Sequence, residues 1–569
     1  MSNPWQVSGK NAAALFTLKV HRGEGMALLA MDWKKGKPPD NFVGFAIEYK
    51  EPNGTQFFPL KNRLAFRKLD GTFNPNELST RLSPIQKFRW VHFPRNADLL
   101  GAFTYQVTPV FMDSVDVLSY GDAQQVAIVL QSETFPDELN IGFARGFVSS
   151  QAFVDRYQKN GAISTLLPAS AKTSLDFVPT HPDANEALAW MGFEARRLVL
   201  AVLDEAIADS TAQVRVVAYD LNEPQVVDRL VTLGSRLRII IDNSGDHGTG
   251  SSETAAEAKL VQSAGAANVK RQKMLNLQHN KTIVVKGKKK KVLCGSTNFS
   301  WRGFYVQANN AVVLQGKKVV DLYSAAFESY WSLDPHAFGG TESAKWADLG
   351  LSDVNAQVAF SPHSPSNVLL QTIADDIASG TKSSLLYSLA FLYETPGPIL
   401  DAIKKMMLSP DRFVYGISDK RVGGLDVQTP NGNVTPVFPS ALGKDVPKPF
   451  SQEPTAGAVG TRMHHKFVVI DADKPSARVY LGSYNFSGAA DTLNGENLLL
   501  IKNQRVATAY MIEAVRLFDH YEFRVLEDKA TTGNKELVLR KPPRQAGEKP
   551  WWDTAYTDPR KIRDRELFS

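Results

Sequence analysis

The sequence predicts an α/β protein in which two tandem α/β/α domains, related by pseudo-twofold symmetry, follow an all-β sandwich. Three observations predict this fold class. Short β-rich runs separated by Gly, Pro, Asn and Asp fill the first 135 residues, strands then alternate with helices, and this alternation occurs twice with its elements in the same order. At roughly 150 residues per domain, the chain of 569 residues is long enough for three or four domains.

Residues 1–135 are predicted to form the sandwich. The runs at 43–49 and 103–110 are rich in Val, Phe, Ile, Tyr and Thr, and turn-forming residues follow or interrupt them. They resemble strands of fibronectin type III or immunoglobulin-like domains, which implies two packed antiparallel sheets. We expect this region to be a packing or docking module and not the site of catalysis.

Residues 140–345 and 346–530 are predicted to be two copies of one fold. Each copy contains a β-rich run, a turn with proline, a helix and a second β-rich run. The runs and helix lie at 214–219, 226–231 and 237–241 in the first copy, and at 385–392, 399–407 and 412–417 in the second. This order is typical of a mostly parallel sheet. A duplicated domain predicts one site at the interface between its copies.

Both copies contain a predicted β-hairpin with the same polar side chains. These are His279, Lys281, Ser296 and Asn298 in the first copy, and His464, Lys466, Ser483 and Asn485 in the second. Residues two apart in a strand point to the same face, so each hairpin should present its polar groups together. Lys and Asn can hold phosphoryl oxygens, while one histidine attacks phosphorus and the other protonates the leaving alcohol. This set of groups needs neither a metal nor another cofactor.

The two hairpins resemble the signature of the phospholipase D superfamily, His-x-Lys-x4-Asp followed by Gly-Ser-x-Asn. The second copy matches throughout, with Asp471 at the aspartate position, whereas the first copy has Lys286 there. The resemblance covers residues 140–530 and implies a phosphodiesterase that works through a phosphohistidine. The site that it implies consists of His279, Lys281, Asn298, His464, Lys466, Asn485 and Glu496, with Ser296 and Ser483 in support.

Glu496 matches the position of a family carboxylate that hydrogen-bonds a catalytic histidine. The corresponding residue of the first copy is Asn309, which cannot be anionic, so the two histidines should differ in basicity. Family members usually use the first histidine as nucleophile, which implies His279 as nucleophile and His464 as acid. The sequence leaves the reverse order open.

Other titratable residues are predicted to be structural. His465 should face away from His464, and the single cysteine, Cys294, should be a buried apolar residue. A single cysteine excludes an intrachain disulfide. Four further histidines have no neighbouring residue at a spacing that indicates a function, and we expect structural or surface roles for them. They are His247, His336, His363 and His520.

The aspartate position should lie far from the reaction. At about 3.3 Å per residue, seven residues of strand place it roughly 23 Å from the histidine, in the hairpin turn. Asp471 and Lys286 are therefore predicted to be structural. The lysines at 286 and 288–291 would form a solvated turn, or else a docking patch remote from the chemistry.

Composition says little about the substrate. Lys and Arg number 65 against 59 Asp and Glu, a formal charge of +6, and five of the positive charges lie in the predicted lysine turn. The N-terminus does not resemble a secretory signal, and apolar runs do not approach the roughly 20 residues of a membrane span. We expect a cytoplasmic protein, or a secreted one if a signal has been removed. The basic segment 533–569 contains Trp551 and Trp552 and should either pack across the body or be disordered.

Three functions remain open from the sequence. The favoured one is hydrolysis of a glycerophospholipid to phosphatidate and an alcohol, with contact at a membrane surface, because two-motif chains with accessory domains often act on lipids. A nuclease is the alternative, supported by the pI near 9.0 and the basic tail. A catalytically silent adaptor is the third. Since one chain holds both motifs, a monomer would suffice for catalysis.

Overall fold

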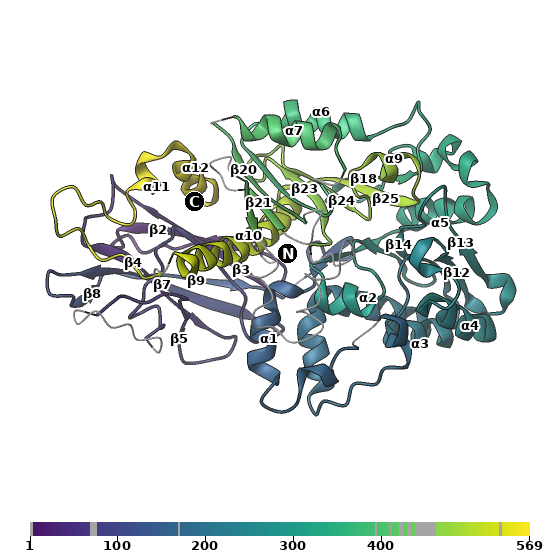
Figure 1. Ribbon diagram of the computed structural model, residues 1–569, viewed down its shortest axis with the longest axis horizontal. Helices are drawn as coiled ribbons and strands as arrows, with labels where there is room; N and C mark the ends of the chain where they lie inside the picture. Colours follow the sequence, from purple (N-terminus) through teal and green to yellow (C-terminus); the bar gives the residue numbers. More distant parts are fainter. Residues whose placement is uncertain are drawn as a thin grey trace.

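The computed structural model describes residues 4–68, 77–131, 133–168, 171–392, 395–409, 411–419, 425–428, 434–437, 463–533 and 537–569. Within these residues, strands form four sheets and helices flank the later two, which makes the protein a mixed α/β structure. Figure 1 shows the N-terminal strands, in purple, at one end of the long axis and the α/β part at the other. The described helices include none with the length and apolar character needed to cross a bilayer.

Two antiparallel sheets form from residues 6–129. The first has the order β1 (Gln6–Ser8), β2 (Phe16–Arg22), β3 (Ala27–Trp33) and β6 (Arg89–His92). The second has the order β5 (Phe58–Pro59), β4 (Phe42–Lys50), β7 (Ala102–Met112) and β8 (Leu118–Tyr120), with β9 (Gln124–Val129) also paired to β7. Their apolar side chains, including Phe16, Phe45 and Phe103, share one buried core. This shared core holds the two sheets together.

Two larger sheets follow, with matching strand orders. The first is β10 (Leu139–Phe143), β16 (Asn310–Gln315), β15 (Lys290–Gly295), β14 (Lys281–Lys286), β11 (Gln213–Ala218), β12 (Leu237–Asp242) and β13 (Val269–Gln272). The second is β17 (Ala347–Asp348), β18 (Asn355–Ser361), β25 (Glu496–Lys502), β24 (Arg478–Gly482), β23 (Lys466–Ile470), β19 (Ser384–Leu389), β20 (Phe413–Asp419), β21 (Leu425–Gln428) and β22 (Val434–Val437). From β10 to β12 and from β18 to β20, antiparallel pairs lead to one parallel pair in each sheet. The repeated order predicted from the sequence is therefore present. The prediction of a mostly parallel sheet is wrong: among the described strands, β11–β12, β12–β13 and β19–β20 are parallel and the other pairs of these two sheets are antiparallel. The reason is that short turns join β14 to β15 and β23 to β24, and strands joined in this way pair antiparallel.

Helices cover the faces of these sheets (Figure 1). They are α1 (Ser150–Tyr157), α2 (Ala184–Ala208), α3 (Pro224–Leu233), α4 (Ser252–Ala264), α5 (Lys317–Ser332), α6 (Leu370–Gly380), α7 (Pro398–Met407), α9 (Gly488–Thr492) and α10 (Gln504–Thr532). The matching helices α3 and α7 each begin with proline, whose fixed φ suits the first helical position. Buried residues recur at helical spacing in both, so one face of each helix packs against its sheet.

Strand β19 is shorter than the β-rich run at 385–392 predicts. It ends at Leu389, and Phe391 adopts φ +65°, which is not an extended conformation. The side chain of Phe391 instead lines a cleft between the two larger sheets.

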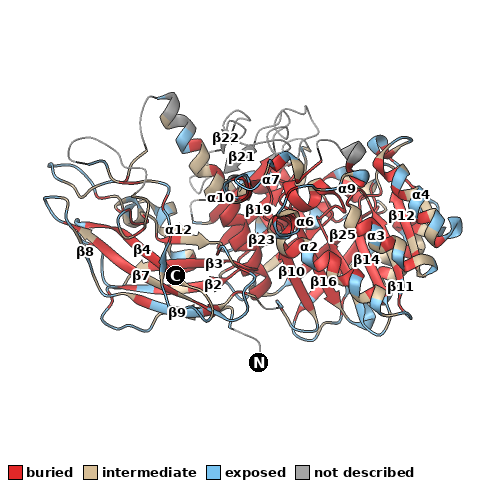
Figure 2. Ribbon diagram, turned by 90° about the horizontal axis from the view of Figure 1, so that it is seen from below, coloured by how far each residue is buried: buried red, intermediate tan, exposed pale blue. Residues whose placement is uncertain are grey.

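A continuous apolar core joins the two larger sheets. Figure 2 shows their strands buried along most of their length, with exposed residues on the outer helix faces. Val216 and Ile283 from one sheet belong to the same buried cluster as Phe467 and Val479 from the other, and Tyr510 of α10 belongs to it as well. Buried on both faces, these strands have almost continuous apolar runs. The core fixes the relative position of the two hairpins described below.

The C-terminal segment packs across the body, which is one of the two arrangements that the sequence left open. Trp551 stacks on Phe88 and donates a hydrogen bond from Nε1 to the Phe42 carbonyl, at 3.0 Å. Its last helices are α11 (Thr554–Thr557) and α12 (Pro559–Phe568). The Phe568 ring is buried against Phe413 of β20. The segment therefore links the N-terminal sheets to the last large sheet.

Candidate active site

Two β-hairpins bring the predicted histidines together. Strand β14 pairs with β15, and β23 pairs with β24, as the sequence predicts. His279 and His464 lie just ahead of β14 and β23, and their ring centroids are 6.3 Å apart. The two imidazoles thus face one site from different hairpins.

Backbone hydrogen bonds that cross between the copies fix this approach. The His279 amide donates to the Gly495 carbonyl at 2.9 Å, and the Gly495 amide donates back to the Leu277 carbonyl at 2.8 Å. On the other side, the His464 amide donates to the Ala308 carbonyl at 3.2 Å. Each histidine is therefore positioned by the strand-entry loop of the other copy.

The same crossing gives the two rings different partners. Nδ1 of His279 lies 2.8 Å from Glu496 Oε2, whereas Nδ1 of His464 lies 2.9 Å from Asn309 Oδ1 and 3.1 Å from the Ser296 carbonyl. All three partners are oxygen acceptors, so Nδ1 carries the proton in both rings and Nε2 keeps its lone pair. The carboxylate supports a positive charge on His279 more strongly than the neutral amide does on His464.

Burial keeps both imidazoles neutral. Desolvation lowers the pKa of His279 to about 4, although the adjacent Glu496 carboxylate opposes the shift. Desolvation also lowers the pKa of His464 well below its usual range, and the positive charges of Lys466 and Lys281 add to the effect. A protonated His464 is therefore a strong acid.

The two lysines lie behind the histidines. Lys281 and Lys466 are buried, and the Nζ of each donates to the carbonyl of the histidine two residues before it. The Lys281 ammonium also lies 4.7 Å from the centre of the Tyr219 ring. Burial lowers the pKa of Lys281 to about 7, against the raising effect of nearby carboxylates. Both lysines support the histidine backbone from beneath.

The Gly-Ser pairs attach each hairpin to its neighbouring strand. Gly295 has φ +130°, and a Cβ there would lie 2.5 Å from the Asn310 carbonyl oxygen. Gly482 has φ +142°, and a Cβ there would lie 2.3 Å from the Asn497 carbonyl oxygen. Only glycine tolerates this conformation and approach.

The serine hydroxyls also connect each hairpin to its neighbouring strand. Ser296 Oγ accepts from the Asn310 amide, and Ser483 Oγ accepts from the Asn497 amide, both at 3.0 Å. They therefore lie between strands and do not face the reacting groups, unlike the single polar patch that alternation along the strand predicts.

A cleft of about 670 Å³ opens over the two histidines. Its lining includes the predicted His279, His464, Asn298 and Asn485, together with Tyr219, Asp220, Asp246, His247, Glu253, Arg302 and Phe391. Most of the residues that line it have polar side chains. The cleft is thus neither an apolar channel nor a uniformly basic groove.

The family model described as "Cardiolipin synthase, PLD-like domain" matches residues 203–331 and 374–517. Each matched segment contains one of the two hairpins. The chain belongs to the phospholipase D superfamily. A protein named phospholipase D from Rickettsia conorii is 42% identical over 48 residues, which are 8% of this chain and 22% of that protein. The chain therefore matches about a fifth of the length of this curated relative.

Two solved structures overlap with this chain only in part. Phosphatidylserine synthase from Haemophilus influenzae Rd KW20 has 12% identity and a TM-score of 0.42, with 59% of this chain and 91% of that chain covered. Nuc, a phospholipase D family member from Salmonella typhimurium, has 26% identity and a TM-score of 0.20, with 24% and 86% covered.

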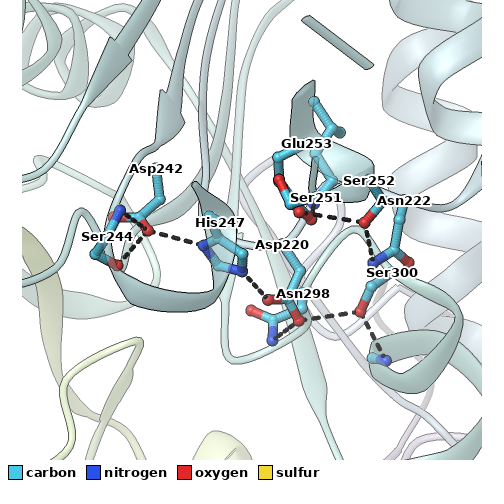
Figure 3. Close-up of polar contacts among 12 residues, drawn as sticks. Asp220, Asn222, Asp242, Ser244, His247, Ser251, Ser252, Glu253, Asn298 and Ser300 are labelled. Atoms are coloured by element: carbon cyan, nitrogen blue, oxygen red, sulfur yellow. Dashed lines mark hydrogen bonds and ion pairs between the residues drawn. The ribbon is translucent and has the colours of Figure 1, made fainter. Parts of the chain in front are cut away.

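Two cleft residues of this superfamily member escaped the sequence analysis. His247, expected to be structural or on the surface, lines the cleft between Asp220 Oδ1, 3.0 Å from its Nε2, and Asp242 Oδ2, 2.8 Å from its Nδ1 (Figure 3). Asp220 also accepts a hydrogen bond of 2.7 Å from Asn298 Nδ2. Burial disfavours the His247 cation, but the two carboxylates outweigh burial and raise the pKa of His247 to about 10.

Position in the sheet could have identified this pair. Asp220 and His247 follow the carboxyl ends of β11 and β12, which are adjacent parallel strands. Ligands of open α/β sheets bind at that edge. The spacing within the sequence carries no such signal, because the two residues come from different loops.

The remaining predicted residues lie away from the reacting groups. His465 is buried, with Nε2 3.0 Å from Glu513 Oε1, and burial raises the pKa of the Cys294 thiol to about 12. At the superfamily's aspartate position, Asp471 is buried and accepts from the Lys382 and Ser383 amides, both at 2.8 Å. Lys286 is exposed at the end of β14. Asp471 and Lys286 thus lie at the far end of the hairpins, whereas His465 and Cys294 lie at the near end with their side chains buried.

We expect Asp471→Ala and Lys286→Ala to differ sharply in stability. Removing the Asp471 carboxylate leaves two amides without their acceptor and should cost about 1–3 kcal/mol. Removing the exposed Lys286 should change stability by less than about 0.5 kcal/mol. Thermal unfolding of both variants measures the difference. Equal losses in Tm would contradict the structural role assigned to the buried carboxylate.

Proposed function

We propose that the protein is a metal-independent phosphodiesterase that forms a phosphohistidine on His279. The observation that carries the proposal is the pair of neutral imidazoles, one from each hairpin, with their Nδ1 atoms hydrogen-bonded and their rings 6.3 Å apart over one cleft. Among the described residues neither Nε2 has a hydrogen-bond partner, so one can attack phosphorus and the other can transfer a proton. Asn298 and Asn485 lie beside them in the cleft.

The reaction runs in two displacements. Nε2 of His279 attacks phosphorus, the bond from phosphorus to the alcohol oxygen breaks, and protonated His464 gives its proton to that oxygen. Water then attacks the phosphohistidine, neutral His464 takes the proton from water, and His279 is released. The negative charge of a bound phosphodiester raises the pKa of His464, which supplies its protonated form.

Glu496 and Asn309 favour this assignment of roles. The imidazole that bonds to phosphorus gains positive charge, which Glu496 stabilises on His279. His464 has only the Asn309 amide oxygen and the Ser296 carbonyl, so its cation gives up a proton more readily. Glu496 thus acts through His279 as a positioning residue.

The site would lie on a pseudo-twofold axis between domains 140–345 and 346–530. Support comes from the matching strand orders and from equivalent contacts on the two sides, such as Asn497 Nδ2 to Asn280 Oδ1 at 2.9 Å and Asn310 Nδ2 to His465 Nδ1 at 3.3 Å. Residues 1–135 would be an accessory all-β domain, and 533–569 a basic tail.

A glycerophospholipid is the substrate that the cleft favours. Asp220, Asp246 and Glu253 line its wall, where a nucleic acid strand would bring several negative charges against carboxylates. A phospholipid presents one diester and a polar head group. The curated relatives named phospholipase D support the same substrate class. Nucleic acid remains the second candidate, because Arg302 also lines the cleft.

We expect phosphatidylcholine vesicles to release choline when incubated with the protein in EDTA, with phosphatidate as the other product. Single-stranded DNA under the same conditions should stay intact. Both products are measured by mass spectrometry. Cleavage of DNA without choline release would contradict the lipid substrate and favour a nucleic acid substrate. Absence of product from both substrates would favour the catalytically silent adaptor.

We expect His279→Ala to abolish phosphorylated protein trapped by rapid denaturation at alkaline pH, where the phosphorus–nitrogen bond of a phosphohistidine survives. His464→Ala should still label slowly from a substrate with a good leaving group, because that alcohol departs without a proton. Labelling with a ³²P diester measures both, and His336→Ala, an exposed histidine, is the matched control. Robust labelling of the His279→Ala protein would reverse the roles.

We expect Glu496→Gln to reduce kcat by roughly 10²-fold, since the ring loses its charged partner and its fixed tautomer. Glu496 raises the pKa of His279, so its removal should lower that pKa. The acidic limb of the kcat/KM profile, where His279 becomes protonated, should then move to lower pH. Asn309→Asp is the reciprocal control, and it should raise the pKa of His464. An acidic limb that moves to higher pH in Glu496→Gln would contradict the role assigned to the contact between Glu496 and His279.

A further inference from the structure

A second cavity, of about 620 Å³, lies between the N-terminal region and the first large sheet. Its lining comes from residues 95–98, Gln131, Arg145, Arg156 and helices α2 and α3. It shares no lining residue with the cleft over the histidines. Its volume falls in the range of about 300–1,000 Å³ that is typical of pockets for small organic ligands.

The lining is rich in arginine. Six arginines contribute to it: Arg95, Arg145, Arg156, Arg196, Arg197 and Arg229. The four carboxylates of the lining are fewer, and three already have partners: Glu186 with Arg156 at 2.8 Å, Glu194 with Arg197 at 3.3 Å, and Asp204 with Arg229 at 2.7 Å. The cavity therefore keeps an excess of positive charge.

Arg145 carries that excess in a buried position. Only 4% of it is exposed, and among the described residues its side chain makes no ion pair or hydrogen bond. The guanidinium carbon lies 3.8 Å, 4.2 Å and 4.5 Å from the ring centres of Phe93, Trp190 and Phe193. Three aromatic rings thus hold the guanidinium in place without neutralising it.

Arg89, a buried arginine of the same junction, has carboxylate partners of its own. Arg89, also 4% exposed, contacts Asp519 at 2.6 Å, Asp564 at 2.7 Å and the Tyr415 hydroxyl at 2.9 Å. A buried charge without a partner is strongly destabilising, and arginine does not lose its proton in proteins. The contrast indicates that the partner of Arg145 comes from outside the chain.

Two donors next to Arg145 also lack acceptors. In the described part of the chain, Arg156 Nη1 and Trp190 Nε1 are buried without a hydrogen-bond partner, as is Arg145 Nε. The Trp190 ring lies beneath both guanidinium groups, 4.2 Å from Arg145 and 5.8 Å from Arg156. Unpartnered donors from three side chains therefore lie around the Trp190 ring.

Backbone strain holds one of the rings over Arg145. Phe193 interrupts α2 with φ +44° and ψ −133°, a conformation that ordinary residues rarely adopt. Its ring contacts Phe93, with centroids 4.9 Å apart, as well as Arg145. The fold thus maintains the aromatic enclosure at a conformational cost.

We propose that this cavity binds a phosphoryl dianion, carried by inorganic phosphate or by a phosphate monoester, with Arg145 as the central anion-binding group. Arginine's planar fork matches phosphate oxygens in pairs, and a phosphoryl group has enough oxygens to accept from Arg145, Arg156 and Trp190 together. A carboxylate has only two oxygens. The cavity leaves room for an organic group on the phosphate. This proposal does not depend on the reaction proposed for the histidine cleft.

Isothermal titration calorimetry with inorganic phosphate and with glycerol 3-phosphate tests the site at constant ionic strength. We expect binding to the wild type and to the His279→Ala/His464→Ala double variant, and at least a tenfold loss in Arg145→Met. The stronger of the two ligands identifies the source of the phosphoryl group. Absence of binding by both ligands, equal binding of acetate, or unchanged binding by Arg145→Met would overturn the proposal. So would loss of binding in the double variant, because the ligand would then occupy the histidine cleft.

Two further variants sharpen the test. Arg197→Gln removes an equal charge from the rim and should bind within about threefold of the wild type, because Arg197 is already paired with Glu194. Trp190→Phe keeps the ring but removes its donor, and should weaken binding about 3–10-fold. Cooperative unfolding of Arg145→Met shows that this variant is folded. If it does not unfold cooperatively, Trp190→Phe becomes the deciding variant, and an unchanged affinity of Trp190→Phe for the phosphoryl ligand would reject the site.

Discussion

The crossed backbone hydrogen bonds between the two hairpins are the constraint on which the candidate site depends. His279 and Leu277 exchange bonds with Gly495, and His464 bonds to Ala308. These bonds set the distance between the imidazoles, and they place Glu496 and Asn309 next to the histidine of the opposite copy. A carboxylate in one copy therefore tunes a ring in the other, and neither copy alone contains a complete site.

The two copies share a backbone arrangement but differ in the side chains that surround their histidines. Strand order and backbone contacts are repeated, yet Glu496 is replaced by Asn309 at the equivalent position. The register of β11 with β14 and of β19 with β23 likewise makes Asp220 equivalent to Phe391. Asp220 binds Asn298 and His247 on one side only. The proposed roles of nucleophile and acid require surroundings that separate the basicities of the two histidines, and these substitutions favour such a separation.

The sequence could predict the repeat and the groups at its centre, but not how they are placed. Periodicity and the two motifs were enough for the hairpins, because strand geometry fixes which residues share a face. They could not show that Lys281 and Lys466 turn beneath the histidines, or that Ser296 bonds across to β16, because those contacts form only when the sheet closes. His247 was missed for the same reason: of its partners, Asp220 lies in the loop after β11, whereas Asp242 ends β12.

The junction with the N-terminal sheets follows the same electrostatic logic as the histidine cleft. Arg89 and Arg505 are buried there, and carboxylates from other parts of the chain neutralise them: Asp519 and Asp564 for Arg89, and Glu24 for Arg505. Such pairs tie β6, α10 and α12 into one unit, since separating them would expose each charge without its partner. Arg145 lies in the same junction, yet rings surround it and no carboxylate of the described chain forms an ion pair with it, although the charge of Asp98 acts on it from a distance. The charge of Arg145 therefore neither joins elements nor has a counter-ion in an ion pair, so it remains available to an anionic ligand. The proposed binding site thus lies where the N-terminal strands meet the α/β part.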